Sequence, residues 1–298
     1  RGGLVTMVAV MFMMAFGIKA GMFPLYFWLP ASYPTPPAAI TALFSGLLTK
    51  VGVYSLIRVF TLIFITDPGF LHGLLLIGAG LTMVSGVLAA ASYYEMRKIL
   101  AVHIVSQIGY IVMGLGLFTE LALAGSIIYL IHIIIVKTNL FLIAGAIRRL
   151  KGSYDLHVLG GLYKERPGLS ILFIISAMSL AGVPPLSGFF AKLTLIIAGL
   201  NAGSWLIAAV ALGVSLLTLY SMTKIWAYVF WKPAPAVLPD LHPMSRAAWF
   251  TFLLPIVGFT IITVALGVFA GPVVDYARLA SGQLMDPSVY IHAVLGGD

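Results

Sequence analysis

Cysteine is absent from the sequence, and charged residues are scarce. Only 9% of the 298 residues are charged, whereas 61% are hydrophobic, and the mean hydropathy is +1.09. A soluble domain carries about a quarter charged residues, so this chain has too little charge to cover a surface in water. The same composition excludes disorder, which goes with few apolar residues and much charge. Without cysteine, disulfides, thiolate chemistry and Cys-ligated metals are excluded.

Acidic residues are rarer than basic ones. Nine Asp and Glu stand against 17 Lys and Arg, which gives a net charge of +8. The basic residues occur in short segments between apolar runs, the distribution that orients membrane proteins, so no nucleic-acid partner is expected. No secretory signal peptide is recognisable. The start at Arg1 instead of Met indicates that the chain is internal to a longer protein.

Long apolar runs predict an all-α, polytopic integral membrane protein. A spanning helix needs about 20 mostly apolar residues. About eight such segments are predicted, at residues 3–22, 38–65, 70–91, 98–118, 121–147, 168–200, 204–231 and 247–271. They are expected to form a single transmembrane domain over residues 1–298, in which residues 275–298 are an extramembrane C-terminal tail.

The charges between the segments predict the orientation. The loops near 92–98, 148–167 and 232–246 fall on one side and carry Arg97, Lys98, Arg148, Arg149, Lys151, Lys164, Arg166, Lys232 and Arg246. The opposite side receives Arg1, Asp67, Glu120, Asp275, Arg278 and Asp286. Because basic loops stay in the cytoplasm, both ends of the chain are expected outside.

Four lysines lie well inside apolar runs: Lys19, Lys50, Lys137 and Lys192. None of the nine acidic residues lies inside a predicted span. A charge at the bilayer centre costs about 2.5–3.5 kcal/mol on insertion scales, so such residues are usually functional. Joined by water or polar side chains, a row of them is suited to passing protons. Lys224 is expected to be structural, because its stem can reach the nearby interface.

Polar stripes accompany these lysines. His103, Ser106, Gln107 and Tyr110 share one helix face by their spacing, which must point into the bundle because lipid offers no hydrogen-bond partners. Thr41, Ser45 and Thr49 form a stripe beside Lys50, and Tyr129, His132 and Asn139 form another. These stripes indicate a hydrated path in the membrane plane. The alternative for His103 and His132 is plain hydrogen-bonded packing.

Two predicted helices are interrupted by proline. Pro24 opens a proline-rich stretch after Lys19, and Pro184 and Pro185 stand before Lys192. Proline removes a backbone donor and breaks regular helix. Paired interrupted helices indicate the ion site of a transporter with inverted repeats, whereas a simple kink or re-entrant loop is the structural alternative. Lys19 and Lys192 would then only satisfy loose carbonyls.

Three segments carry a resemblance to a known family. They are FPLYFWLPASYPTPPAAITALFSGLLTKVGVYSLIRVFTLIF after Lys19, SYYEMRKILAVHIVSQIGYIVMG, and AGVPPLSGFFAKLTLI. The sequence resembles the antiporter-like membrane subunits of respiratory complex I and of Mrp-type multisubunit Na+/H+ antiporters, most closely the D-type subunits of the Mrp group. The match covers nearly everything up to about residue 231.

The resemblance implies a fourteen-helix fold with two inverted five-helix repeats, each with a discontinuous helix. It places Lys19 on the key lysine of the first broken helix and Lys50 on the connecting lysine. His132 and Lys137 fall in the helix of the central histidine or lysine, and Lys192 falls on the terminal lysine. One paralogue group has glutamate at this terminal position. The lysine at position 192 departs from that group and favours the Mrp-type group. The family's first six helices, with the glutamate that pairs with the Lys19 position, have no counterpart here.

Three functions remain open from the sequence. The first is a proton-translocating subunit of a cation (Na+)/proton antiporter in the bacterial inner membrane, a transporter and not an enzyme. The second is a proton-pumping subunit of a complex I-like quinone reductase or a membrane-bound hydrogenase. The third is a purely structural membrane subunit. No cofactor or metal is expected in the chain itself. The expected partners are other membrane subunits, protons, the lipid bilayer and, as a further candidate, Na+.

Overall fold

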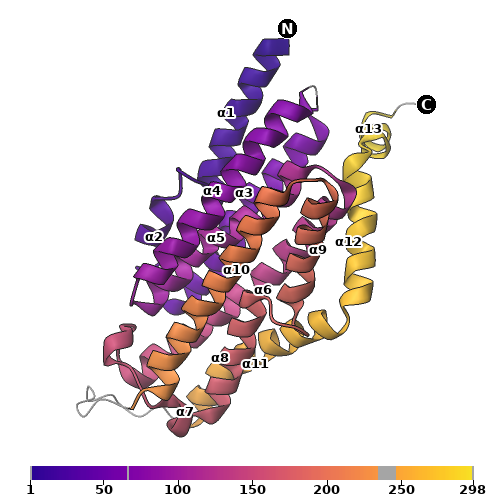
Figure 1. Cartoon of the computed structure of the whole chain (residues 1–298). Helices are drawn as coiled ribbons and strands as arrows, with labels where there is room; N and C mark the ends of the chain where they lie inside the picture. The colour runs from indigo at the N-terminus through magenta and orange to yellow at the C-terminus, as the bar shows by residue number, and fades with distance from the viewer. Residues whose placement is uncertain (1, 66, 234–245, 297–298) are drawn as a thin grey trace.

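The computed structural model describes residues 2–65, 67–233 and 246–296, which form a bundle of helices and no strand (Figure 1). The helices are α1 (Gly2–Ala20), α2 (Trp28–Ser32), α3 (Ala38–Leu62), α4 (Pro68–Ser92), α5 (Met96–Leu117), α6 (Glu120–Lys151), α7 (Leu162–Glu165), α8 (Pro167–Ala181), α9 (Ser187–Asn201), α10 (Trp205–Trp226), α11 (Arg246–Val268), α12 (Ala270–Met285) and α13 (Ser288–Leu295). A 3-10 turn, η1 (Leu156–Val158), and a π-helical turn, η2 (Ala227–Trp231), complete the described elements.

The predicted apolar segments all correspond to helices. Seven of the described helices are long and apolar enough to cross a membrane, namely α1, α3, α4, α5, α6, α10 with η2, and α11. The predicted segment 168–200 is instead two shorter helices, α8 and α9, of 15 residues each. An all-α membrane bundle with two interrupted helices is therefore confirmed.

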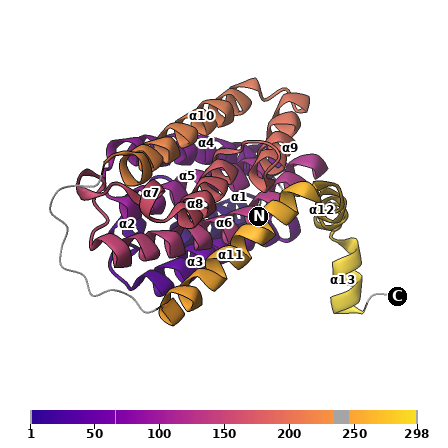
Figure 2. The ribbon, with the colours of Figure 1, turned by 90° about the horizontal axis from the view of Figure 1, so that it is seen from below.

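Helix α5 lies at the centre of the bundle. Nearly all its residues are buried, its polar stripe included, as expected for a helix enclosed by others. Figure 2 shows α4 and α10 on one flank of α5 and α6, and α3 and α11 on the other. Small residues allow close packing at this centre: a Cβ on Gly86 of α4 would lie 2.4 Å from the amide nitrogen of Ser106.

Two of the three predicted basic loops lie together at one end of the bundle, and residues 234–245 of the third lie outside the described residues. The α4–α5 turn and the segment from η1 to α7 lie at this end, and both ends of the described chain lie at the opposite one (Figure 1). An isolated bridge between Glu95 and Asp155 joins the two basic loops. The relative placement of loops and chain ends therefore agrees with the predicted alternation of spans.

The C-terminal helices lie on the side of the bundle. Helix α11 contains Pro255 and contacts α6, α8 and α9, and α12 stands beside α6 and α3 (Figure 1). The placement of residues 275–298 outside the membrane stays a prediction, because the structure contains no bilayer.

Candidate functional site

The first helix break follows a glycine in the left-handed region. Gly21 has φ +83°, and the amides of Gly21 and Met22 each donate to the carbonyl of Gly17 at 2.9 Å. This pattern ends α1 cleanly, since glycine adopts that conformation without a Cβ penalty. The indole nitrogen of Trp28 then donates to the carbonyl of Ile18 at 2.8 Å. The predicted break at Pro24 thus lies between α1 and α2.

The second break has the same construction. Gly182 has φ +91°, and the amides of Gly182 and Val183 each donate to the carbonyl of Met178 at 3.0 Å. Pro184 and Pro185 follow, as predicted, between α8 and α9. From α9, the Lys192 ammonium reaches back to donate to the carbonyl of Ala181 at 3.0 Å. A cation at a helix C-terminus is favoured by the helix dipole.

Lys19 lies at the end of α1 and is exposed on the bundle surface. Within the described part of the chain, its side chain has no hydrogen bond or ion pair. The backbone at Lys19 and Ala20 packs directly on α3, where a Cβ on Gly52 would lie 2.6 Å from the Ala20 nitrogen. The structure therefore brings α1 against the helix of Lys50 but leaves the Lys19 side chain uncovered.

Lys50 and Lys137 are buried in the middle of α3 and α6. The Lys50 ammonium donates to the carbonyl of Ser45, and the Lys137 ammonium donates to the carbonyl of Leu100 in α5 at 3.1 Å. The ion pairs of the described residues, Lys98–Glu95 and Lys151–Glu165, lie at the end with the basic loops. Both buried lysines are thus held by carbonyls and not by carboxylates.

His132 lies against the second break. Its Nδ1 is 2.8 Å from the Ser187 hydroxyl, which is 3.1 Å from that of Ser179. Gly188 is essential for this approach, because a Cβ there would lie 1.9 Å from the Ser179 carbonyl and 2.9 Å from the imidazole. The structure thus joins His132 to both halves of the broken helix. Ser179 and Ser187 were not identified from the sequence, where only their proximity to the prolines singles them out.

The predicted stripe on α5 connects α6, α9 and α10. His103 Nε2 lies 2.6 Å from the Ser221 hydroxyl, and the Tyr129 hydroxyl donates to Gln107. The Tyr110 hydroxyl contacts that of Ser215 in α10 at 2.7 Å.

Aromatic rings link this stripe to the buried cations. The Lys192 ammonium lies 4.9 Å from the centre of the Tyr110 ring. The ring centres of Tyr110 and Tyr129 are 5.2 Å apart, and those of Tyr129 and His132 are 5.5 Å apart. The structure therefore brings Tyr110, His132 and Lys192 into one cluster.

Most of the unpartnered polar atoms in the described chain follow the same line through the bundle, whereas His72 Nε2 and Arg97 Nε lie near the starts of α4 and α5. In the described chain, buried side-chain atoms without a hydrogen-bond partner include Thr49 Oγ1, His103 Nδ1, Ser106 Oγ, Gln107 Nε2, His132 Nε2 and Asn139 Oδ1. These residues belong to α3, α5 and α6. Buried polar groups are nearly always hydrogen-bonded, and where protein does not serve them, water is the usual partner. These unpartnered atoms are the positions on this line at which water would bond.

Lys224 occupies a different position from the other buried lysines. Its ammonium donates to the carbonyls of Ala91 and Tyr93, both at 2.7 Å, where α4 ends at the basic-loop side. It also lies 4.6 Å from the centre of the Tyr94 ring. The stem thus extends to the end of the bundle, which is the geometry that the sequence predicted.

Comparison with known proteins gives one family match. The family described as NADH:quinone oxidoreductase/Mrp antiporter, TM, matches residues 2–218. Two similar proteins are each named as the D subunit of a Na(+)/H(+) antiporter. The one from Alkalihalophilus pseudofirmus OF4 is 52% identical over 295 residues, and the one from Bacillus subtilis 168 is 42% identical over 293 residues. Each alignment covers 98% of this chain and 59% of the relative, so the chain spans about three fifths of these relatives' length.

Solved structures of an Mrp complex and of respiratory complex I contain chains that superpose on this one. A chain in the structure of the Mrp complex from Dietzia sp. DQ12-45-1b superposes with a TM-score of 0.90 and 37% identity, covering 98% of this chain and 61% of that one. A chain of respiratory complex I from Thermus thermophilus with bound NADH superposes with a TM-score of 0.78 and 27% identity, covering 93% of this chain and 58% of that one.

Proposed function

This chain belongs to the NADH:quinone oxidoreductase/Mrp antiporter transmembrane family, and we propose that it moves protons as part of a D-type component of a multisubunit Na+/H+ antiporter. The protons would travel in the plane of the membrane, from Lys19 and Lys50 through Lys137 and His132 to Lys192. In this role the chain is a transporter component and not an enzyme.

The observation that carries the proposal is the way the buried lysines are held. Lys50, Lys137 and Lys192 each bond to a backbone carbonyl, and Lys192 also faces an aromatic ring. A carboxylate would fix a lysine as a permanent cation, whereas desolvation with only carbonyl partners brings the charged and neutral forms closer in free energy. Each lysine can then receive a proton from a neighbouring water and release it on the other side. The unpartnered polar atoms of α3, α5 and α6 support water along that route.

The proposal includes a longer subunit. Lys19 lies exposed on α1, together with large apolar side chains such as Leu4, Met7 and Met11. A cation in a spanning segment is normally covered by protein. The resemblance implies six further helices before Lys19. These helices would cover Lys19 and supply its acidic partner, which would complete a fourteen-helix fold.

We also propose the orientation and the location. The basic loops would lie in the cytoplasm and both ends of this chain outside, in a bacterial inner membrane. Other membrane subunits are the proposed partners, because the similar structure with the highest TM-score given above belongs to a complex. Sodium would be moved by the whole assembly, since no carboxylate of the described residues pairs with Lys50, Lys137 or Lys192.

A complex I-like role is the second candidate, favoured by the superposition on the T. thermophilus chain. A lysine at position 192 and the higher identity to the antiporter subunits favour the first. The test is purification of the complete subunit with its companions, followed by assay in everted membrane vesicles. Sodium-dependent dissipation of an imposed proton gradient supports the antiporter role. Companions that reduce quinone, with no response to sodium, would overturn it.

A further inference from the structure

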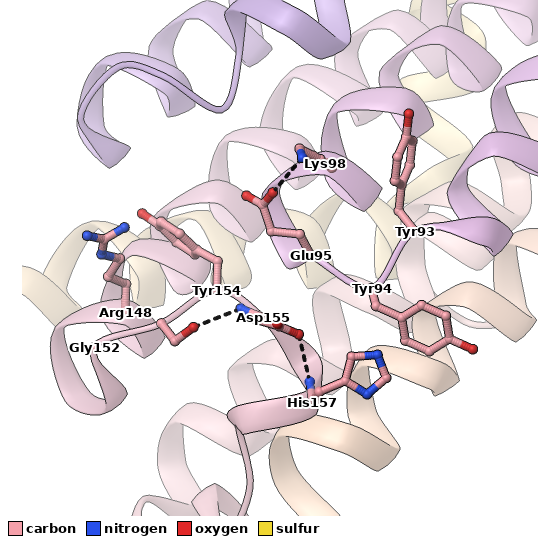
Figure 3. Close-up of a pocket in the computed structure, with 10 residues that line it drawn as sticks. Tyr93, Tyr94, Glu95, Lys98, Arg148, Gly152, Tyr154, Asp155 and His157 are labelled. Carbon is pink, nitrogen blue, oxygen red and sulfur yellow. Dashed lines mark hydrogen bonds and ion pairs between the residues drawn. The ribbon is translucent and has the colours of Figure 1, made fainter. Parts of the chain in front are cut away.

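The end of the bundle with the basic loops contains an open pocket beside Lys224. Its volume is about 550 Å³, and its walls come from the α4–α5 turn and the loop before η1. Figure 3 shows Glu95 and Lys98 paired on one wall of the pocket and Tyr94 beside His157. The Lys98 nitrogen lies 3.3 Å from the Glu95 carboxylate. The Tyr94 and His157 rings stack at 4.6 Å. The pocket is therefore wide enough for many waters and is lined by charged and hydroxyl groups.

Tyr94 separates this pocket from the Lys224 ammonium. Its ring lines the pocket and also lies 4.6 Å from Lys224 Nζ. Lys224 is almost fully buried, with 7% of its surface exposed. Its partners are the backbone carbonyls of Ala91 and Tyr93, and among the described residues no carboxylate pairs with it.

Above Lys224, polar groups continue into the bundle. Ser221 lies one helical turn earlier on α10, and its hydroxyl contacts His103 Nε2 at 2.6 Å. His103 is completely buried, and its Nδ1 has no hydrogen-bond partner among the described residues. One turn further along α5, Gln107 contacts Tyr129, and Tyr110 beyond it faces Lys192. Buried polar groups thus follow one another from the pocket to the transfer axis.

We propose that the pocket and Lys224 form the site where protons are taken up from the basic-loop side and passed through the Ser221–His103 pair to the axis, an inference that rests on the proposed function. Water that enters from the pocket past the Tyr94 ring would give a proton to the neutral Lys224 amine. The ammonium would then pass a proton through water to the Ser221 hydroxyl, which would give its own proton to His103 Nε2. Lys224 returns to the amine, and the imidazole releases its Nδ1 proton to water on the side of the axis.

The competing role for Lys224 is structural, as a cap on the last carbonyls of α4. Arginine separates the two roles. It can still donate to the carbonyls of Ala91 and Tyr93 and stack on Tyr94, but it does not release its proton. Lys232 supplies a matched control: its ammonium donates to the carbonyl of His157 at 2.6 Å and lies 5.7 Å from the Tyr228 ring centre, yet it is exposed.

The experiment measures Na+/H+ exchange and assembly in the complete complex for Lys224→Arg, Lys232→Arg and Lys192→Arg. A second pair, Ser221→Ala and Thr223→Ala, removes hydroxyls from α10. The Ser221 hydroxyl reaches His103, whereas that of Thr223 bonds only to carbonyls of its own helix. We expect Lys224→Arg to lower exchange by at least about tenfold, as losses of proton-transferring groups commonly do. Ser221→Ala should also lower exchange clearly. The two controls, Lys232→Arg and Thr223→Ala, should leave exchange and assembly unchanged.

Full exchange with Lys224→Arg, while Lys192→Arg is inactive, would overturn the uptake site and leave the proposed function standing. Full exchange in both would overturn the proposed function itself. If Lys224→Arg prevents assembly, Ser221→Ala decides: normal assembly with lowered exchange supports the uptake site, and normal exchange contradicts it.

Discussion

The ammonium of Lys192 lies 3.0 Å from the carbonyl oxygen of Ala181, so a lysine on one half of the broken helix closes the C-terminus of the other half. The stem of Lys192 passes directly over Gly182, where a Cβ would lie 2.9 Å from the lysine Cδ. The break and the cation therefore form one unit. This relationship gives Lys192 both a structural contact and a place beside the Tyr110 and His132 cluster.

The orientation is testable by cysteine labelling, for which the chain offers a background free of cysteine. Lys164→Cys lies in the 148–167 loop, and Gly69→Cys lies at the other end, with open space around it. An impermeant maleimide should label Lys164→Cys only from the cytoplasmic side and Gly69→Cys only from outside. Labelling of Lys164→Cys from outside would contradict the proposed orientation.

Residues 1–298 expressed alone should not support Na+/H+ exchange. The physical reason is that Lys19 is exposed and the α1 surface around it is apolar, so the first part of the proposed axis would be incomplete. Everted vesicles with the chain alone would be compared with vesicles that contain the complete complex at equal amounts of protein. Robust exchange by the chain alone would show that no further helices are needed.

The contact between α1 and α3 should be sensitive to one methyl group. Gly52→Ala would place a Cβ 2.6 Å from the Ala20 nitrogen and 2.9 Å from the Lys19 carbonyl carbon, which is backbone and cannot turn aside. Overpacking of this kind costs about 1–3 kcal/mol, so the melting temperature of the purified complex should fall by several degrees. Gly73→Ala in α4 meets nothing within 4 Å and is the control. Equal melting temperatures for the two variants would refute the close contact.

The fold was largely predictable because its signals are local. Apolar runs specify the spans, and Pro24, Pro184 and Pro185 specify the breaks, since each effect acts within a few residues. The buried lysines were also recognisable, because a charge inside an apolar run is visible in the sequence. Their roles in proton transfer stay predictions.

The side-chain contacts within the site were not predictable, because they join residues that are far apart in the sequence. His103 and Ser221 are 118 residues apart, and their contact depends on how α5 and α10 pack. The exposure of Lys19 likewise depends on which helices cover α1. A stripe of polar residues indicates which face points inward, but not which atom it meets there.

The most direct test of the proton-transfer axis is Na+/H+ exchange by the assembled complex with Lys192→Arg, measured beside Lys192→Ala. Arginine can donate to the Ala181 carbonyl and face the Tyr110 ring, so it keeps the structural contact and the charge, but it does not deprotonate. If Lys192 passes protons, both variants should assemble and both should lose exchange. An Arg variant that retains most of the exchange, together with an Ala variant that fails to assemble, would show that Lys192 is a structural cation and contradict the proposal.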